Sequence, residues 1–283
     1  MTKEIGFSPI RSEVAQMLES RIAAWSVFTK PWRHMEPSRL AALVRRMGFD
    51  GVELPVRDGF QVQPGDPSSR LRKVADIFQD HGLRIYSVAG APTEELFVAC
   101  AESGVPQIRI MIPVSDDGFT ATGRLVRDEL NDIASRSSKY PVRVIVQPHF
   151  GYFVSNSVDL ANLLKDYDPE SIGAIWDAAH EALAGRAPEH GLESLWRWLS
   201  LVNFKNVYYR RTNAEGSQKV EWKPYFTDGP DGMAQWGRAI RYLVEHSYSG
   251  PICLTAEYTD ETDLESRVTH DLKFAQSLVK ESL

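Results

Sequence analysis

The sequence has few cysteines and no long apolar run. Cys100 and Cys253 are its only cysteines, and two cannot make the disulfide framework of a small secreted domain, so they fit a reducing compartment. No stretch of about 18 apolar residues is present that could span a membrane. The N-terminal segment also lacks the apolar core of a signal peptide. We therefore expect a soluble cytoplasmic protein without a membrane partner.

The sequence also has fewer basic than acidic residues. The chain has 32 Lys and Arg against 38 Asp and Glu, which gives a formal charge of −6. A negatively charged surface repels phosphate backbones. We therefore expect no nucleic-acid partner.

The 283 residues, 43% of them hydrophobic, suffice for one large buried core. Short β-rich runs alternate with longer amphipathic runs, as in βα units on a parallel sheet. The predicted strands are Ile22–Phe28, Gly51–Pro55, Arg84–Ala89, Gln107–Ile112, Arg143–Gln147, Ile172–Asp177, Val202–Tyr208 and Ile252–Glu257. An open, doubly wound sheet usually has a glycine-rich first turn, and the turn here, 29–32, has no glycine. We predict one (β/α)8 TIM barrel domain over residues 1–283.

Amphipathic segments separate the strands. The predicted helices are Pro37–Met47, Ser69–His81, Pro92–Ser103, Thr122–Ser137, Ser157–Leu164, Gly191–Leu199, Gly232–His246 and Leu264–Val279. Residues 1–21 are expected to be an N-terminal extension, with a helix at Arg11–Ser20, that closes the bottom of the barrel. The longest irregular stretch is Arg210–Asp231, which predicts a functional or mobile loop.

Polar residues gather where the predicted strands end, and this is where a TIM barrel carries its chemistry. Asp177 and Glu257 each close an apolar strand, and a buried carboxylate must be paired, hydrogen-bonded or bound to a metal. Asp177 could instead cap a helix that begins near Ala178, and His180 could be an ordinary helix-surface histidine. Convergence from several strands favours a site. The other polar residues at strand ends are Glu53, Gln147, His149, Asn203, Lys205 and Asn206.

Several segments are typical of one family. They are GFDGVELP at 48–55, GLRIYSVAG at 82–90, IGAIWDAAHEALAG at 172–185, NFKN at 203–206 and SGPICLTAEY at 249–258. With these segments the chain resembles the xylose-isomerase-like TIM barrels, which include sugar phosphate isomerases and epimerases and endonuclease IV. The resemblance extends from about Ile22 to Ala275.

The resemblance implies a divalent metal at the top of the barrel. Its four ligand positions correspond to Gln147, Asp177, Asn203 and Glu257, so two ionisable ligands of the family are neutral amides here. Two carboxylates and two amides suit Mg²⁺ or Mn²⁺ better than Zn²⁺, with weak binding or none. Epimerases of the family use two glutamates as a proton-transferring pair, which Gln147 cannot complete. His149, His180 and Glu257 are therefore the expected catalytic residues, and Lys205 is a further possible proton carrier.

A set of cations follows the predicted strands: Lys30, Arg33, Arg57, Lys205, Arg210 and Arg211. These residues could be plain surface charge, or they could hold an anionic sugar acid or sugar phosphate. Under the second interpretation Glu53, Lys205, Arg210 and Arg211 bind the substrate.

The expected function is a metal-assisted isomerase, epimerase or related lyase that acts on a small, polyhydroxylated, anionic carbohydrate. The alternative is a degenerate barrel that binds a sugar-like ligand with little or no turnover. A DNA-repair endonuclease is disfavoured, because that activity in this fold needs many more histidines and a basic face. A homodimer is left open.

Overall fold

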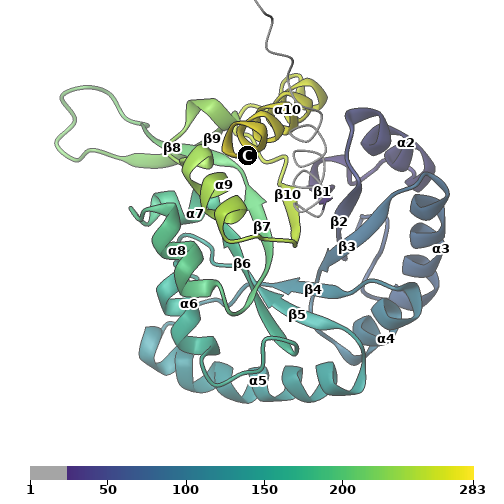
Figure 1. The fold of residues 1–283 in the computed structure, drawn as a ribbon. Helices are drawn as coiled ribbons and strands as arrows, with labels where there is room; N and C mark the ends of the chain where they lie inside the picture. Colours follow the sequence, from purple (N-terminus) through teal and green to yellow (C-terminus); the bar gives the residue numbers. More distant parts are fainter. Residues whose placement is uncertain (1–23) are drawn as a thin grey trace, which may run out of the picture.

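In a computed structural model that describes residues 24–283, eight parallel strands close into a barrel (Figure 1). Around the barrel the strands follow the order β1, β10, β7, β6, β5, β4, β3, β2. The barrel strands are β1 (Ala24–Phe28), β2 (Gly51–Pro55), β3 (Arg84–Ala89), β4 (Gln107–Ile110), β5 (Arg143–Val146), β6 (Ile172–Asp177), β7 (Leu199–Phe204) and β10 (Pro251–Leu254). The predicted (β/α)8 TIM barrel is confirmed.

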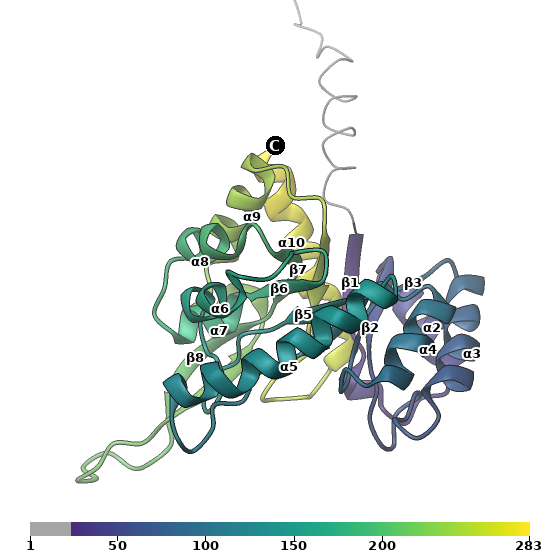
Figure 2. The same ribbon diagram turned by 90° about the horizontal axis from the view of Figure 1, so that it is seen from below.

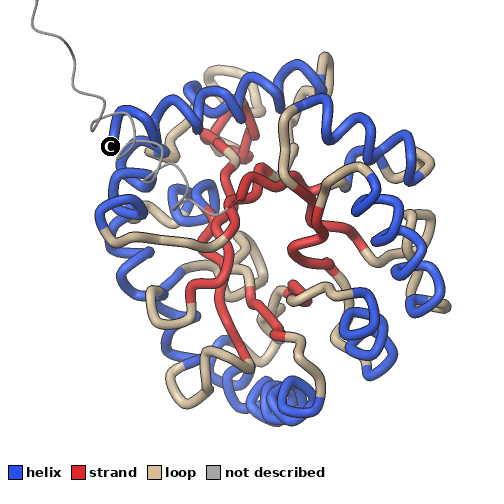
Figure 3. Tube along the Cα trace, turned by 45° about the vertical axis from the view of Figure 1, so that its right-hand side comes forward, coloured by secondary structure: helices blue, strands red, loops and turns tan. Residues whose placement is uncertain are grey.

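A ring of helices surrounds the strands (Figure 3). The helices are α2 (Pro37–Met47), α3 (Pro67–Asp80), α4 (Glu94–Ser103), α5 (Phe119–Lys139), α6 (Ser157–Leu164), α7 (Ala178–Leu183), α8 (Pro188–Leu195), α9 (Trp236–Glu245) and α10 (Leu264–Ser282), with short 3-10 helices at Lys30–Trp32 and Gly229–Asp231. In α2, Pro37 stands where a missing N–H is tolerated, and Gly48 ends the helix with a φ of 97°. Leu40 and Val44 turn its buried face toward the sheet.

Side chains along each strand point alternately to the inside and the outside of the barrel, which gives two apolar regions. One lies between the strands and the helices, and a smaller one fills the barrel interior with Phe28, Ala89, Ile145, Ile175, Leu201 and Cys253. Successive side chains of a strand point to opposite faces. Gln147, Asp177 and Asn203 each stand two positions beyond a member of the interior cluster. They therefore point into the barrel at its carboxyl end.

The predicted seventh strand, Val202–Tyr208, is two strands. β7 ends at Phe204, and β8 (Asn206–Arg211) leaves the barrel to pair antiparallel with β9 (Trp222–Thr227). The buried Asn206 amide stabilises this change of direction, because its Oδ1 accepts from the backbone N–H groups of Val207 and Ala234 at 2.9 and 2.7 Å. Figure 2 shows the β8–β9 ribbon projecting beyond the ring of helices. The expectation of an irregular loop at Arg210–Asp231 is therefore wrong.

Other boundaries differ by a few residues. α8 begins at Pro188, three residues before the predicted start, because proline is favoured at the first helical position. α9 begins at Trp236, after the turn that contains Gly232. The predicted helix at Arg11–Ser20 lies outside the described residues. Within 24–283, no helix combines the length and the apolar character needed to cross a membrane.

Candidate active site at the carboxyl end of the barrel

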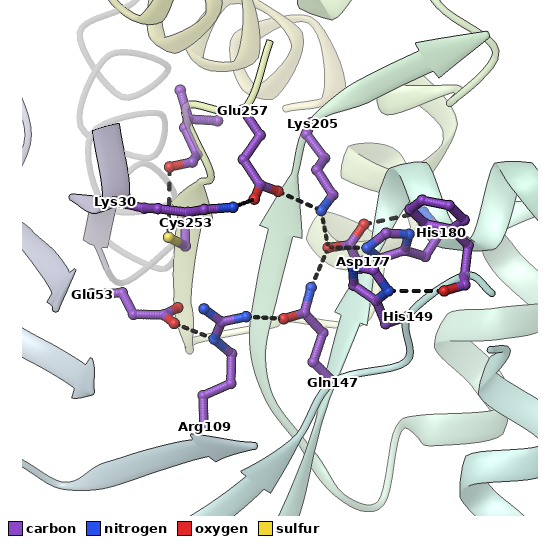
Figure 4. Close-up of polar contacts among 12 residues, drawn as sticks. Lys30, Glu53, Arg109, Gln147, His149, Asp177, His180, Lys205, Cys253 and Glu257 are labelled. Atoms are coloured by element: carbon purple, nitrogen blue, oxygen red, sulfur yellow. Dashed lines mark hydrogen bonds and ion pairs between the residues drawn. The ribbon is translucent and has the colours of Figure 1, made fainter. Parts of the chain in front are cut away.

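The polar side chains at the carboxyl end of the barrel form one connected network (Figure 4). Lys205 stands between β7 and β8 and lies at the centre of this network. Its Nζ lies 2.8 Å from Oε2 of Glu257 and 3.6 Å from Oδ2 of Asp177. A second ammonium group, that of Lys30, donates to Oε1 of Glu257 at 2.8 Å. Each carboxylate oxygen of Glu257 therefore accepts a hydrogen bond from a lysine.

Gln147 and Arg109 continue the network across the barrel to β2. Nε2 of Gln147 donates to Oδ2 of Asp177 at 2.7 Å, and Nη1 of Arg109 donates to Oε1 of Gln147. Nε of Arg109 donates to the buried carboxylate of Glu53. Burial raises the pKa of Glu53, and the charge and hydrogen bond of Arg109 offset this only in part. The amide of Gln147 is oriented by a carboxylate on one side and a guanidinium on the other.

Sequence reasoning missed Arg109. It lies in the apolar run QIRIMI, on β4, where its side chain is 8% exposed. An arginine inside an apolar strand must find a buried partner, because an unpaired buried charge is costly. That signal was present in the sequence, but it named neither Glu53 nor Gln147 as the partner.

Opposite charges balance around Lys205. Burial alone would raise the pKa of Glu257, but the ammonium groups of Lys205 and Lys30 outweigh it and hold the pKa well below its usual range. Burial opposes ionisation of Asp177 too, yet the ammonium of Lys205 and the backbone N–H of His180, which donates to Oδ1 at 3.1 Å, bring its pKa below the usual value. Burial would lower the pKa of Lys205, whereas Asp177 and Glu257 raise it above the usual value. Two carboxylates thus face two ammonium groups, and their charges cancel.

The two predicted histidines lie against each other with ring centroids 4.3 Å apart. Nδ1 of His149 lies 2.9 Å from the carbonyl oxygen of Phe150, which can only accept, so Nδ1 carries the proton and Nε2 remains a base. Burial lowers the pKa of half-buried His149. Burial lowers the pKa of His180 to about 3, so this histidine is neutral near pH 7. The fixed proton on Nδ1 leaves Nε2 of His149 free to accept a proton.

A cavity of about 670 Å³, here called the Lys205 cavity, opens over this network. Its polar lining comes from Lys30, Arg33, His149, Lys205, Glu257, Thr259 and Glu261, and its aromatic lining from Phe60, Phe150, Phe226 and Tyr258. Phe226 belongs to β9, so the base of the ribbon forms one wall. Aromatic faces combined with a few fixed polar groups are typical of small-molecule sites.

Three buried residues at this end of the barrel keep polar atoms without a partner among residues 24–283. The atoms are Oδ1 of Asn203, both ring nitrogens of His180 and Nη2 of Arg109. Nε2 of His180 lies 4.0 Å from Oδ2 of Asp177, beyond hydrogen-bond distance.

The residues present do not fit the divalent-metal centre that the resemblance implies. Only Asp177 and Glu257 among the four expected ligands carry negative charge, and Gln147 directs its NH₂ group, not its oxygen, at Asp177. The ammonium group of Lys205 lies between the two carboxylates, where a shared cation would bind. A dication placed there would add positive charge to a neutral cluster. In the described part of the chain, no three His, Cys, Asp or Glu side chains form a group that could hold a metal ion.

The structure places most predicted site residues together and two of them elsewhere. Glu53, Gln147, His149, Asp177, His180, Asn203, Lys205 and Glu257 all lie at the carboxyl end of the barrel. Arg210 packs over the ring of Tyr225, 5.2 Å from its centroid, and Arg211 bonds to Asn213 and Ala214 within the ribbon. Neither arginine lines the Lys205 cavity. Both are carried away because β8 leaves the barrel.

The chain is similar to curated sugar-converting enzymes and to solved TIM barrel structures, of which three are described. Inosose dehydratase from Salmonella typhimurium is 24% identical over 139 residues, 47% of this chain and 46% of that protein, so the alignment spans less than half of each. D-psicose 3-epimerase from Clostridium cellulolyticum H10, solved with D-tagatose, has a TM-score of 0.68 and 12% identity over 90% of this chain and 99% of its own. A xylose isomerase-like TIM barrel protein from Mycobacterium smegmatis, solved with magnesium, has a TM-score of 0.67 and 14% identity over 92% and 97%.

The family match covers most of the chain. Residues 41–278 match the family described as "Xylose isomerase-like TIM barrel". This match agrees with the closed barrel and with the cluster of polar residues at the carboxyl ends of its strands. The chain therefore belongs to the xylose isomerase-like TIM barrel family.

Proposed function

We propose that the chain is an enzyme that moves a proton beside a carbonyl group of a small carbohydrate, as an isomerase, epimerase or dehydratase. One observation carries the proposal: the buried ammonium of Lys205 and the basic Nε2 of His149 face the same cavity. The dehydratase and the epimerase among the similar proteins support this class of reaction. Arg33 at the cavity wall favours a sugar acid or sugar phosphate as substrate.

Lys205 supplies the electrophile in this proposal. An ammonium group has three N–H donors, of which Lys205 directs one at Glu257 and another toward Asp177. The third can donate to a carbonyl oxygen of the substrate and stabilise the negative charge that develops there. Glu257 and Asp177 hold the ammonium in place and keep it charged. The expected proton-carrying role of Glu257 thus gives way to a positioning role.

His149 acts as the base. Its Nε2 takes the proton from the carbon next to the carbonyl, and the electron pair of the broken C–H bond moves onto the oxygen held by Lys205. Return of the proton to the neighbouring carbonyl carbon gives isomerisation when the proton of the adjacent hydroxyl passes to the oxygen held by Lys205. Delivery of a solvent proton to the opposite face of the same carbon, with His149 releasing its own proton to solvent, gives epimerisation. Transfer of the proton from His149 to the hydroxyl of the next carbon lets that hydroxyl leave as water, which gives dehydration.

The Mg²⁺ or Mn²⁺ that the resemblance implies has no step in this proposal. The reason is electrostatic: Lys205 already supplies the positive charge that a shared metal would place between Asp177 and Glu257. The magnesium in the Mycobacterium smegmatis structure belongs to that protein.

Hydrogen–deuterium exchange into substrate tests the proposal. A panel of ketoses, aldoses, sugar acids and sugar phosphates is incubated with the protein in D₂O, and ¹H NMR follows loss of the C–H signal beside the carbonyl. We expect Lys205→Met to slow exchange by about 10²–10³-fold, because it removes the charge that stabilises the oxyanion. Lys223→Met, on the exposed face of β9, is the matched control and should leave exchange unchanged.

Saturable binding of a panel member without any exchange would contradict the proposed catalytic activity. It would favour the alternative, a barrel that binds a sugar without converting it. Exchange that survives Lys205→Met would remove Lys205 from the mechanism.

A further inference from the structure

A second cavity lies on the opposite flank of the network. Its volume is about 330 Å³, and it lies between the ends of β3 and β4 and helix α5. Two guanidinium groups line it, those of Arg57 and Arg109. We call it the arginine cavity. Neither arginine lines the Lys205 cavity.

Arg109 has one donor group to spare. Its Nε donates to Glu53 and its Nη1 to Gln147, whereas its buried Nη2 has no hydrogen-bond partner among residues 24–283. Leaving a buried, charged donor unpaired is costly. Because the other two nitrogens fix the plane of the guanidinium, the free Nη2 keeps one direction.

Arg57 adds a second cation that lacks a fixed partner. It follows β2 and is half-buried, and within the described residues its guanidinium forms no side-chain hydrogen bond or ion pair. Burial and the charge of Arg109 lower the pKa of Arg57, and the charges of Glu53 and Glu257 oppose this only in part. Glu129 also lines the cavity, but its side chain is exposed and bonds to neither arginine in this part of the chain. An anion between the two guanidiniums would relieve their repulsion.

The remaining walls are mostly apolar. They include Val56, Ile112, Val126 and Leu130, all buried. We propose that the arginine cavity binds a small organic oxyanion, with its carboxylate or phosphate on Arg57 and Nη2 of Arg109 and its carbon skeleton against the apolar wall. Guanidinium groups suit both oxyanions, because their planar donors match carboxylate and phosphate oxygens. This binding site stands apart from the proposed turnover in the Lys205 cavity.

Isothermal titration calorimetry with simple probes tests the site without any need for activity. The probes are benzoate, phenyl phosphate and inorganic phosphate, with neutral benzamide as the uncharged control. We expect saturable binding of at least one anion and none of benzamide. Binding of benzoate but not phenyl phosphate would identify a carboxylate ligand, and the reverse would identify a phosphate ester.

Variants locate the binding. Arg57→Gln should weaken anion binding by about tenfold or more, because it removes a charge-assisted hydrogen bond. Arg39→Gln is the matched control, since it removes an exposed guanidinium of α2 that lines neither cavity, and it should leave binding unchanged. Arg33→Gln removes an exposed guanidinium from the Lys205 cavity and reports any anion binding there. Thermal unfolding verifies that the three variants are folded, as their exposed or half-buried positions lead us to expect. The proposal is wrong if no probe anion binds, or if binding is lost in Arg33→Gln but not in Arg57→Gln. Neither result affects the exchange assay, which tests the Lys205 cavity independently.

Discussion

Nζ of Lys205 donates to Oε2 of Glu257 at 2.8 Å, and the lysine side chain of this pair is only 4% exposed. Residues 52 positions apart in the sequence thus form an ion pair at the mouth of the barrel. Removing one member would leave an uncompensated buried charge, so the pair acts as one unit. It also gives the site a permanent cation between two carboxylates, on which the predictions about chemistry depend.

The wild-type protein should bind Mn²⁺ only weakly, with a Kd above about 1 mM, because the cation position is already neutralised. The triple variant Gln147→Glu/Asn203→His/Lys205→Met removes the ammonium and adds a carboxylate and an imidazole. We expect it to bind Mn²⁺ at least about tenfold more tightly. The electron paramagnetic resonance signal of free Mn²⁺ measures the Kd of the wild type and that of the triple variant. Tight binding by the wild type that Asp177→Asn abolishes would show that a metal displaces Lys205.

The pH dependence of turnover should report His149. A histidine acts as a base only when neutral, and burial lowers the pKa of His149, so it stays neutral further into the acid range. We expect kcat/KM in the exchange assay to fall only below the ordinary histidine pKa of about 6.5. His149→Ala should abolish most of the activity, and His34→Ala, at the exposed surface, should not alter the profile. An acid limb that persists in His149→Ala would assign the base to another residue.

Asp271 should make stability depend on pH. This buried carboxylate accepts from the N–H of Gly229 at 2.7 Å and from the hydroxyl of Tyr258 at 2.8 Å, and burial raises its pKa to about 6. The folded state therefore holds the proton more tightly than the unfolded state. Its contribution to stability is present below the unfolded pKa of about 3.9 and is lost as pH rises through about 6.

Asp271→Asn cannot ionise and keeps an acceptor for Gly229. We expect the free energy of unfolding of the wild type, relative to this variant, to decrease by up to about 3 kcal/mol between about pH 4 and pH 7. Urea unfolding at several pH values measures it, with the exposed Asp117→Asn as control. Parallel pH curves for wild type and Asp271→Asn would contradict the raised pKa.

Asn206 should be essential to the break between β7 and β8. Its Oδ1 accepts from the N–H groups of Val207 and Ala234, and its Nδ2 donates to the carbonyl oxygens of Gly229 and Ala234 at 2.6 and 3.0 Å. Asn206→Ala should lower the free energy of unfolding by about 2–4 kcal/mol, because it leaves several buried backbone groups unpaired. Asn162→Ala, at an exposed position of α6, should cost far less. Equal urea midpoints for the two variants would show that the amide is dispensable.

The sequence by itself determined the barrel and most of its parts. Periodicity and end signals are local, so Pro37–Met47 and Ser157–Leu164 could be predicted as helices residue by residue. The same local logic placed Asp177 and Glu257 at the carboxyl ends of strands, where the barrel brings its polar residues together.

Only the tertiary structure decided how those residues pair. The run that contains Lys205 has a strand pattern throughout, and its break depends on Gly229 and Ala234, which contact Asn206 from more than 20 residues away. That break sends Arg210 outward with the ribbon and leaves Lys205 at the mouth of the barrel.

The tertiary structure also decided which cation lies between the two carboxylates of the site. The sequence showed two carboxylates and predicted a metal between them, because spacing along the chain does not reveal which cation lies nearest. Closure of the barrel brings Lys30 and Lys205 to Glu257, and it brings Arg109 to Glu53. Charge neutralisation depends on distance in space, which sequence separations of 52 to 227 residues cannot report.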